Sequence, residues 1–367
     1  MHGYRAPRWL PGGNLQTIWA ARASRRHLGP PPRFERERWA TPDGDFIDVD
    51  HLLPQPAAAP QPVVPAGVPR QHLVLFHGLE GSSESQYAQA FASVARSRGW
   101  AYSVPHFRGC SGELNRAPRA YHSGDFEEIG WILQRLRARH GAPLLVVGIS
   151  LGGNALLRWA QEAGDSAAAA AAAVAAVCSP IDLAASGAAI DRGFNRLVYT
   201  RMFLATMKPK ALAKWQQHPG LFDRERLAAA RTLYEFDNVF TAPLHGFRDT
   251  ADYWQRASAK PHLARIRIPA LVLNALDSNI ALYVTPSEVA ARTAHHFPLV
   301  TRPMASLADA VTAATYRAEG SAGFDRPGAY GATTVGDCRN WAKQIDRATS
   351  ESLDWPSRVR RQLAGWR

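Results

Sequence analysis

The pentapeptide Gly148-Ile149-Ser150-Leu151-Gly152 restricts the fold of this chain more than any other segment. The apolar run before it, residues 144–147, is typical of a buried strand, and residues 154–159 after it are typical of a helix. Glycine on both sides of a serine at a strand-to-helix junction is the pattern of a nucleophile elbow. So sharp a turn favours residues without Cβ. The segment therefore predicts an α/β protein in which Ser150 projects from the end of a strand.

The composition is typical of a globular protein, and the cysteine content indicates a reducing compartment. The 367 residues are 46% hydrophobic and 20% charged, and no apolar run reaches membrane-spanning length. The beginning of the sequence lacks the apolar core of a signal peptide. Three cysteines without metal-like spacing predict neither a disulfide framework nor a metal site. We therefore expect a cytoplasmic location, no integral membrane segment, no metal and no cofactor.

The net charge of +12 raises the question of a polyanionic partner. The excess is almost entirely arginine, scattered from Arg5 to Arg367, and its one tight cluster lies at residues 358–361. A solvated basic surface explains this distribution better than a nucleic-acid site, so no nucleic-acid partner is expected. Peripheral membrane association and the oligomeric state are left open.

Strand and helix patterns alternate between residues 72 and 178, which predicts a parallel, doubly wound sheet. The strand pattern then stops until residues 269–274, and the intervening helical stretch predicts a cap over the carboxyl ends of the strands. The predicted parts are an N-terminal arm (1–40), an α/β core (41–185), a helical cap (186–260), the end of the core (261–300) and an atypical tail (301–367), for which disorder is one interpretation.

A serine hydroxyl needs donors that stabilise the oxyanion formed when it attacks a carbonyl. In an elbow, one donor is the backbone N–H of the following residue, here Leu151. The second donor is expected from the loop after the strand at 72–76, which reads HGLEGSS, and Leu79 is the candidate there. The alternative interpretation of this loop is an ordinary glycine-rich turn.

Five segments in fixed order carry a family resemblance: PRWLPGGNLQT at 7–17, HGLEGS at 77–82, FRGCSGE at 107–113, YHSG at 121–124 and GISLGGN at 148–154. On these segments the chain resembles the α/β hydrolases of the YheT-like branch, which are associated with hydrolysis of carboxylic and acylglycerol-type esters. The resemblance implies an α/β-hydrolase fold, a mostly parallel doubly wound sheet with a helical cap insertion, and a small-molecule ester as substrate.

From about residue 277 the chain departs from the family pattern. The family's acid position falls on Ser278, so Asp277 is the candidate acid of the triad, against a simple turn-forming role. The loop that contributes the family's histidine is absent, and His296 of the pair at 295–296 is the candidate base, against an exposed or packed pair. His77, His106 and His122 are expected to hold loops or shape the site. A reading-frame change in the gene is one hypothesis for the unfamiliar tail.

Two functions follow from these residues. The first is a serine hydrolase that cleaves carboxylic esters, short-chain or acylglycerol-like, with apolar cap residues favouring an apolar substrate moiety (Phe203, Leu204, Trp215 and Phe240). The second is a catalytically impaired or non-catalytic relative on the same fold, which the missing histidine loop motivates. Phosphonate labelling of Ser150 separates the two.

Overall fold

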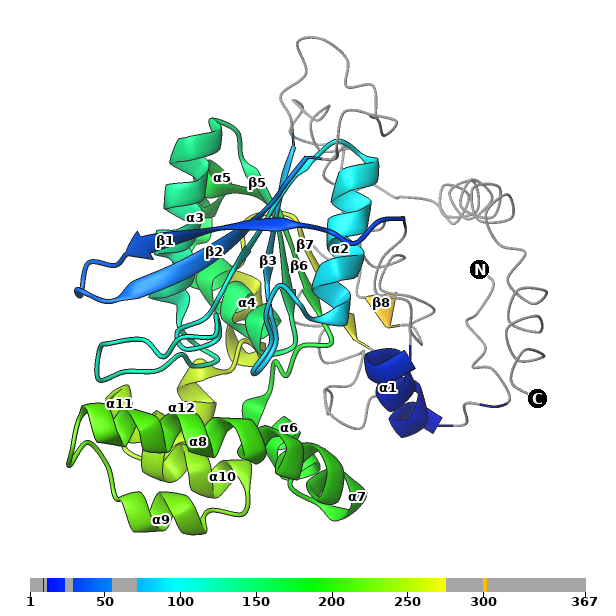
Figure 1. The fold of residues 1–367 in the computed structure, drawn as a ribbon. Helices are drawn as coiled ribbons and strands as arrows, with labels where there is room; N and C mark the ends of the chain where they lie inside the picture. The colour runs from blue at the N-terminus through cyan, green and yellow to red at the C-terminus, as the bar shows by residue number, and fades with distance from the viewer. Residues whose placement is uncertain (1–8, 10–11, 24–28, 55–70, 275–299, 302–367) are drawn as a thin grey trace. The chain divides into compact units, whose positions relative to one another are not determined.

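An eight-stranded sheet runs through the part of the chain that the structure describes (Figure 1). The strand order is β1-β2-β4-β3-β5-β6-β7-β8. Pairs β1–β2 and β2–β4 are antiparallel, and every other neighbouring pair is parallel. The strands are β1 (Phe34–Ala40), β2 (Phe46–Leu52), β3 (His72–Phe76), β4 (Ala101–Pro105), β5 (Leu144–Ile149), β6 (Ala171–Val177), β7 (Ala270–Asn274) and β8 (Val300–Thr301). The predicted mostly parallel sheet is confirmed.

The structure is a computed structural model, and it describes residues 9, 12–23, 29–54, 71–274 and 300–301. All of these residues belong to one compact unit, Tyr4–Glu319. Within the described residues, no helix is long and apolar enough to cross a membrane. No cluster of three or more His, Cys, Asp or Glu side chains in the same part of the chain is arranged to hold a metal ion.

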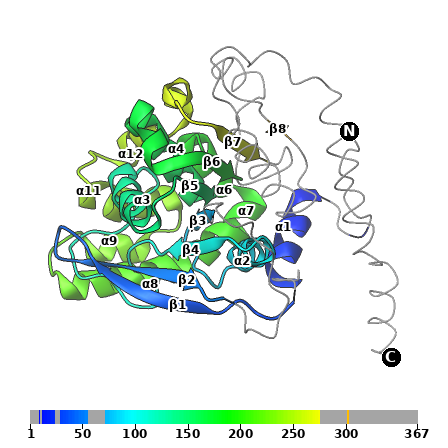
Figure 2. The ribbon, with the colours of Figure 1, turned by 90° about the horizontal axis from the view of Figure 1, so that it is seen from above.

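Both faces of the sheet are covered because the central strands are apolar on both sides. Val74 and Phe76 pack with helices α3 (Phe126–His140) and α4 (Leu151–Ala163), whereas Leu73 and Leu75 pack with α2 (Gln86–Ser97). Neighbouring residues of a strand point to opposite faces, so a continuous apolar run fills two cores at once. Figures 1 and 2 show the resulting layers, with helices on either side of the sheet.

Between β6 and β7 the chain is helical and forms the cap drawn below the sheet in Figure 1. Its elements are α6 (Leu183–Ile190), α7 (Gly193–Asn195), η2 (Arg196–Thr200), α8 (Arg201–Gln217), α9 (Arg224–Ala229), α10 (Leu233–Phe236), η3 (Asp237–Thr241), α11 (Ala242–Leu244), α12 (Thr250–Ala257) and η4 (Lys260–Arg265). Segments η2 and η3 are π-helical. The cap has its own apolar core, which includes Leu204, Phe236 and Phe240.

Two segments contain more regular structure than the sequence patterns indicated. The expected N-terminal arm contains helix α1 (Gly12–Ala23) and strand β1, whose Arg36 and Arg38 form ion pairs with their register partners Asp50 and Asp48 on β2. The alanine run at 167–173, whose composition alone does not distinguish a loop from a helix extension, divides into α5 (Ala167–Ala170), next to η1 (Gly164–Ser166), and the first residues of β6. Residues 171–173 lie in β6, which pairs with β5 and β7, and alanine fills such a position without crowding its neighbours.

Candidate active site

Ser150 occupies a strained turn between β5 and α4. Its backbone has φ 51° and ψ −120°, which side-chain-bearing residues rarely adopt. The turn is held by the N–H of Ser150, which donates to the carbonyl of Val177 on β6 at 2.9 Å. The carbonyl of Ser150 accepts from the N–H groups of Gly153 and Asn154 at 3.0 and 3.2 Å. Backbone strain of this kind costs about 1–3 kcal/mol and is concentrated at functional sites.

The glycines of the pentapeptide are required because the elbow packs backbone against backbone. A Cβ on Gly148 would lie 2.5 Å from Cα of Gly153, inside the first turn of α4. A Cβ on Gly152 would lie 2.6 Å from the carbonyl oxygen of Phe76, and nearer still to that of His77. The close approach of β5, α4 and the end of β3 therefore depends on residues without side chains.

The loop after β3 runs beside the elbow, since a Cβ on Gly78 would lie 3.2 Å from Cβ of Ser150. The N–H of Gly78 donates to Tyr87 Oη, that of Glu80 to Tyr121 Oη, and that of Gly81 to the carbonyl of Gly78. Leu79 N–H has no partner among the residues that the structure describes.

Leu151, directly after Ser150, is the second residue near the elbow whose backbone N–H has no partner among the described residues. It is the first residue of α4. The first N–H groups of a helix lie at the positive end of its dipole. Leu79, Ser150 and Leu151 are among the residues that line one cavity.

His77 is fully buried and holds the loop in place. Its Nε2 accepts the N–H of Phe107 at 3.1 Å, so the proton of the neutral ring is on Nδ1, which donates to the carbonyl of Gly78 at 2.8 Å. Burial lowers the pKa of His77 to about 3. Both ring nitrogens are occupied, and the ring cannot take a proton from Ser150.

His106 and His122 also fill structural positions. His106 Nε2 lies 2.8 Å from Asp50 Oδ2 in the buried region around β2. His122 lines the cavity, but its Nδ1 accepts the N–H of Gly124 at 3.2 Å, which leaves the proton of the neutral ring on Nε2. Burial, with Arg119 nearby, lowers the pKa of His122 to about 3. His122 is therefore a neutral donor rather than a base.

The cavity has a volume of about 160 Å³ and lies between the core and the cap. From the cap, Phe203, Met207 and Phe240 line it, together with Trp254. Of the four cap residues that the sequence offered for an apolar substrate moiety, Phe203 and Phe240 reach the cavity. The other two lie elsewhere: Leu204 packs inside the cap, and Trp215 lies under the guanidinium of Arg224.

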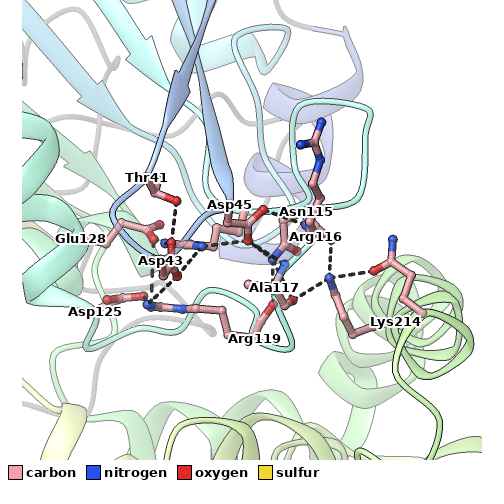
Figure 3. Close-up of polar contacts among 12 residues, drawn as sticks. Thr41, Asp43, Asp45, Asn115, Arg116, Ala117, Arg119, Asp125, Glu128 and Lys214 are labelled. Carbon is pink, nitrogen blue, oxygen red and sulfur yellow. Dashed lines mark hydrogen bonds and ion pairs between the residues drawn. The ribbon is translucent and has the colours of Figure 1, made fainter.

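A buried polar network holds the loop between β4 and α3, next to cap helix α8 (Figure 3). Arg108 binds Asp45 at 2.8 Å and Glu128 at 2.5 Å, and Asp45 also accepts from Asn115 Nδ2 at 2.7 Å. Burial raises the pKa of Asp45, but the hydrogen bonds that its carboxylate accepts outweigh burial and lower this pKa to about 2. Lys214 of α8 donates to the carbonyls of Asn115 and Ala117, which ties the cap to this loop.

The predicted triad acid and base are outside the described residues. Strand β7 ends at Asn274, whose Oδ1 accepts the N–H of Ser179 at 2.8 Å. Asp277 and His296 follow it, and their roles stay predictions, as does the reading-frame hypothesis for the tail.

The geometry matches a known family. The model of the family described as the alpha/beta hydrolase fold matches residues 71–304. The chain belongs to the α/β-hydrolase fold family. This α/β hydrolase is 40% identical over 267 residues to the "Putative esterase YheT" of Escherichia coli K12, covering 72% of this chain and 74% of that protein. The resemblance to the YheT-like branch is therefore confirmed.

More distant relatives share parts of the chain. The α/β hydrolase is 29% identical over 253 residues to "Phospholipase ABHD3" of Mus musculus, covering 68% of this chain and 59% of that protein. It is 26% identical over 224 residues to "Monoacylglycerol lipase" of Saccharomyces cerevisiae, covering 57% of this chain and 48% of that protein. Relatives with these names support ester hydrolysis as the general class of reaction.

Proposed function

We propose that this α/β hydrolase is a serine hydrolase that cleaves carboxylic esters of small molecules. The observation that carries the proposal is that strained Ser150 lines one cavity together with Leu79 and Leu151, whose backbone N–H groups have no partner among the described residues. Two preorganised donors beside a nucleophile are what acyl transfer requires. An ordinary structural turn would not need two residues with unbonded N–H groups beside the same cavity.

In the proposed reaction, Ser150 Oγ attacks the acyl carbonyl and gives its proton to an imidazole, for which His296 is the candidate, oriented by Asp277. The carbonyl electrons move to the oxygen, which Leu79 and Leu151 stabilise through their N–H groups. The intermediate then expels the alcohol, which takes the proton from the imidazolium. Water attacks the acyl-enzyme by the same route and releases the acid.

The lining of the cavity supports an apolar acyl or alcohol moiety. Phe203, Met207 and Phe240 offer a surface that gains free energy when it covers hydrocarbon. Esters of the acylglycerol type fit this description, and the names of the relatives favour the same class. The free thiol of Cys110 agrees with the reducing cytoplasm that we propose as the compartment.

The second candidate is a catalytically impaired relative that binds esters without turning them over. It is favoured by the departure of the sequence from the family pattern after residue 276, where the base and the acid should be. Such a protein would keep the elbow and the cavity, and it would bind a substrate analogue without activating Ser150.

A fluorophosphonate probe tests the two candidates. We expect stoichiometric labelling of Ser150 that is abolished in Ser150→Ala, and slowing by about 10³-fold or more in His296→Ala, because an unassisted hydroxyl is a poor nucleophile. His122→Gln is the matched control and should label at close to the wild-type rate, since the Nδ1 of His122 already accepts a hydrogen bond and its lowered pKa makes it a poor base. A folded sample that is not labelled would establish the impaired relative instead.

A further inference from the structure

The turn that presents Leu79 contains a residue in an unfavourable conformation. Gly78 accepts a hydrogen bond from the N–H of Gly81 at 2.9 Å, so residues 78–81 form a β-turn. Glu80, at its third position, has φ 57°, whereas Leu79 does not have a positive φ. This sign pattern belongs to a type II turn, whose third position favours glycine or asparagine. A glutamate there has to be held by contacts of its own.

The side chain of Glu80 supplies those contacts. Tyr121 Oη accepts the backbone N–H of Glu80 at 3.0 Å and lies 2.9 Å from Oε1 of the same residue. Oε2 forms an ion pair with Lys210 Nζ at 2.8 Å, and the Glu80 side chain is only 9% exposed. Lys210 belongs to helix α8 of the cap and also lies 3.9 Å from the Sγ of Cys110. The cap therefore holds the turn directly, through one charged pair.

The Glu80–Lys210 ion pair matters because Leu79, the candidate oxyanion donor, is the residue directly before Glu80. Tyr87 holds the N–H of Gly78, and the carbonyl of Gly78, which shares a peptide group with the Leu79 N–H, accepts from the N–H of Gly81 and from His77 Nδ1. Tyr121 and Lys210 fix Glu80, the residue after Leu79. The direction of the Leu79 N–H is thereby determined from both sides, and an oxyanion donor is useful only when its direction is fixed before the reaction.

We propose that Glu80 and Lys210 are positioning residues, and that their ion pair makes the oxyanion-hole geometry at Leu79 depend on the seating of cap helix α8. This inference rests on the proposed function, in which Leu79 is an oxyanion donor. Through this ion pair, the cap would contribute to the rate of the chemical step as well as cover the substrate.

The kinetic test uses p-nitrophenyl ester hydrolysis and the rate of phosphonate labelling at Ser150. Glu80→Ala and Lys210→Met should each lower kcat by about 10- to 100-fold with KM within about threefold of wild type, because a misdirected donor weakens transition-state binding. The double variant should be no worse than either single variant, since both remove the same pair. Glu80→Gly should recover most of the kcat lost in Glu80→Ala, because glycine adopts φ 57° without an anchor.

Lys208→Met is the matched control, because Lys208 lies on the same helix but donates to the carbonyls of Ala228 and Ala230. It should leave kcat unchanged. Equal kcat in wild type and Lys210→Met, or equal loss in Glu80→Ala and Glu80→Gly when both are folded, would overturn the inference.

Amide hydrogen exchange separates this inference from the proposed function. If wild type is not labelled, the proposed function fails, and the coupling is then tested by exchange alone. Residues 77–86 should exchange at least fivefold faster in Lys210→Met than in Lys208→Met. Equal exchange in the two variants would contradict the coupling whatever the activity of the protein.

Discussion

The carbonyl oxygen of His77 occupies the place that a side chain on Gly152 would need. A Cβ there would also lie 2.6 Å from the carbonyl oxygen of Phe76, so two consecutive carbonyls of the β3 end lie against the first turn of α4. The elbow and the loop that carries Leu79 are thereby in direct backbone contact. Any residue larger than glycine at position 152 would separate the nucleophile from the predicted oxyanion donor.

Gly152→Ala should therefore damage both the stability and the reactivity of Ser150. Overpacking of this kind costs about 1–3 kcal/mol, and backbone atoms cannot move aside as a side chain can. A displacement of about 1 Å between reacting groups costs about 100-fold in rate. We expect the free energy of unfolding to fall by about 3 kcal/mol in urea denaturation, and phosphonate labelling to slow by about 100-fold.

Gly220→Ala is the control for the glycine substitution itself. Gly220 has φ +85° and no atom within 4 Å of an added Cβ, so the change introduces backbone strain without a clash. It should cost about 1 kcal/mol and leave labelling unchanged. If Gly152→Ala behaved like Gly220→Ala, the close contact between the elbow and the loop would not determine reactivity.

Asn154 joins the elbow helix to two other segments and should not tolerate a charge. Its Nδ2 donates to the carbonyls of Ser123 and Ala257 at 2.9 and 2.8 Å, and the side chain is fully buried. Asn154→Asp would place a buried carboxylate oxygen against these carbonyl oxygens, while the other oxygen keeps only the N–H of Ala259 among the described residues, and such a charge costs about 3–5 kcal/mol. Thermal unfolding monitored by circular dichroism measures the loss.

The same substitution at Asn238 should be tolerated. Asn238 uses its Oδ1 to accept from Thr250 N at 3.2 Å, and an aspartate keeps that acceptor. We expect Asn238→Asp to change stability by less than about 1 kcal/mol. Equal effects at the two positions would mean that the donor role of Asn154 contributes little.

The parts of the site that the sequence predicted are those in which local geometry limits the choice of residue. The elbow at Ser150 needs glycine at fixed spacing, so its position is readable from five letters. Glu80 could not be predicted, because a glutamate with positive φ is held only by Tyr121 and Lys210, which lie 41 and 130 positions further along the chain. Strand β1 was missed for a similar reason, since the arginines of FERERWA find their aspartates only once the strands pair.

Lys214 is nearly fully buried, and its removal should loosen the cap. It donates to the carbonyls of Asn115 and Ala117, which belong to the loop between β4 and α3, and to Gln217 Oε1. Hydrogen bonds from a charged donor contribute about 1.5–3 kcal/mol each. Lys214→Met should lower the free energy of unfolding by about 3 kcal/mol, which chemical denaturation would detect.

Lys208→Met provides the comparison for Lys214. Lys208 also donates to two backbone carbonyls, but it is more exposed and both acceptors belong to the cap itself. It should cost about 1 kcal/mol or less, because water replaces the lost donor. Proteolysis of the loop at 115–120 should accelerate in Lys214→Met alone. Equal susceptibility of the two variants would contradict an anchoring role for Lys214.

The contact between His122 and His245 should make the protein sensitive to acid. Their ring centroids are 4.4 Å apart, and burial, with His122 adjacent, lowers the pKa of His245 to about 3. In the unfolded chain a histidine takes up a proton near pH 6.5. As the pH falls below 6.5 the unfolded state therefore binds protons that the folded state does not, and stability is lost progressively until pH 3 is approached.

His245→Phe removes one such group while keeping an aromatic ring in place. The Nε2 of His245 is buried without a partner among the described residues, so this substitution sacrifices no hydrogen bond at that atom. Between pH 6.5 and 4.5 the variant should lose about 2 kcal/mol less stability than wild type, from the slope of about 1.4 kcal/mol per pH unit for one titrating group. Urea denaturation across that range gives the two curves. His245→Gln should show the same shallower slope despite losing the ring, because the effect comes from the proton; a slope that follows the aromatic ring instead would assign the acid sensitivity to packing.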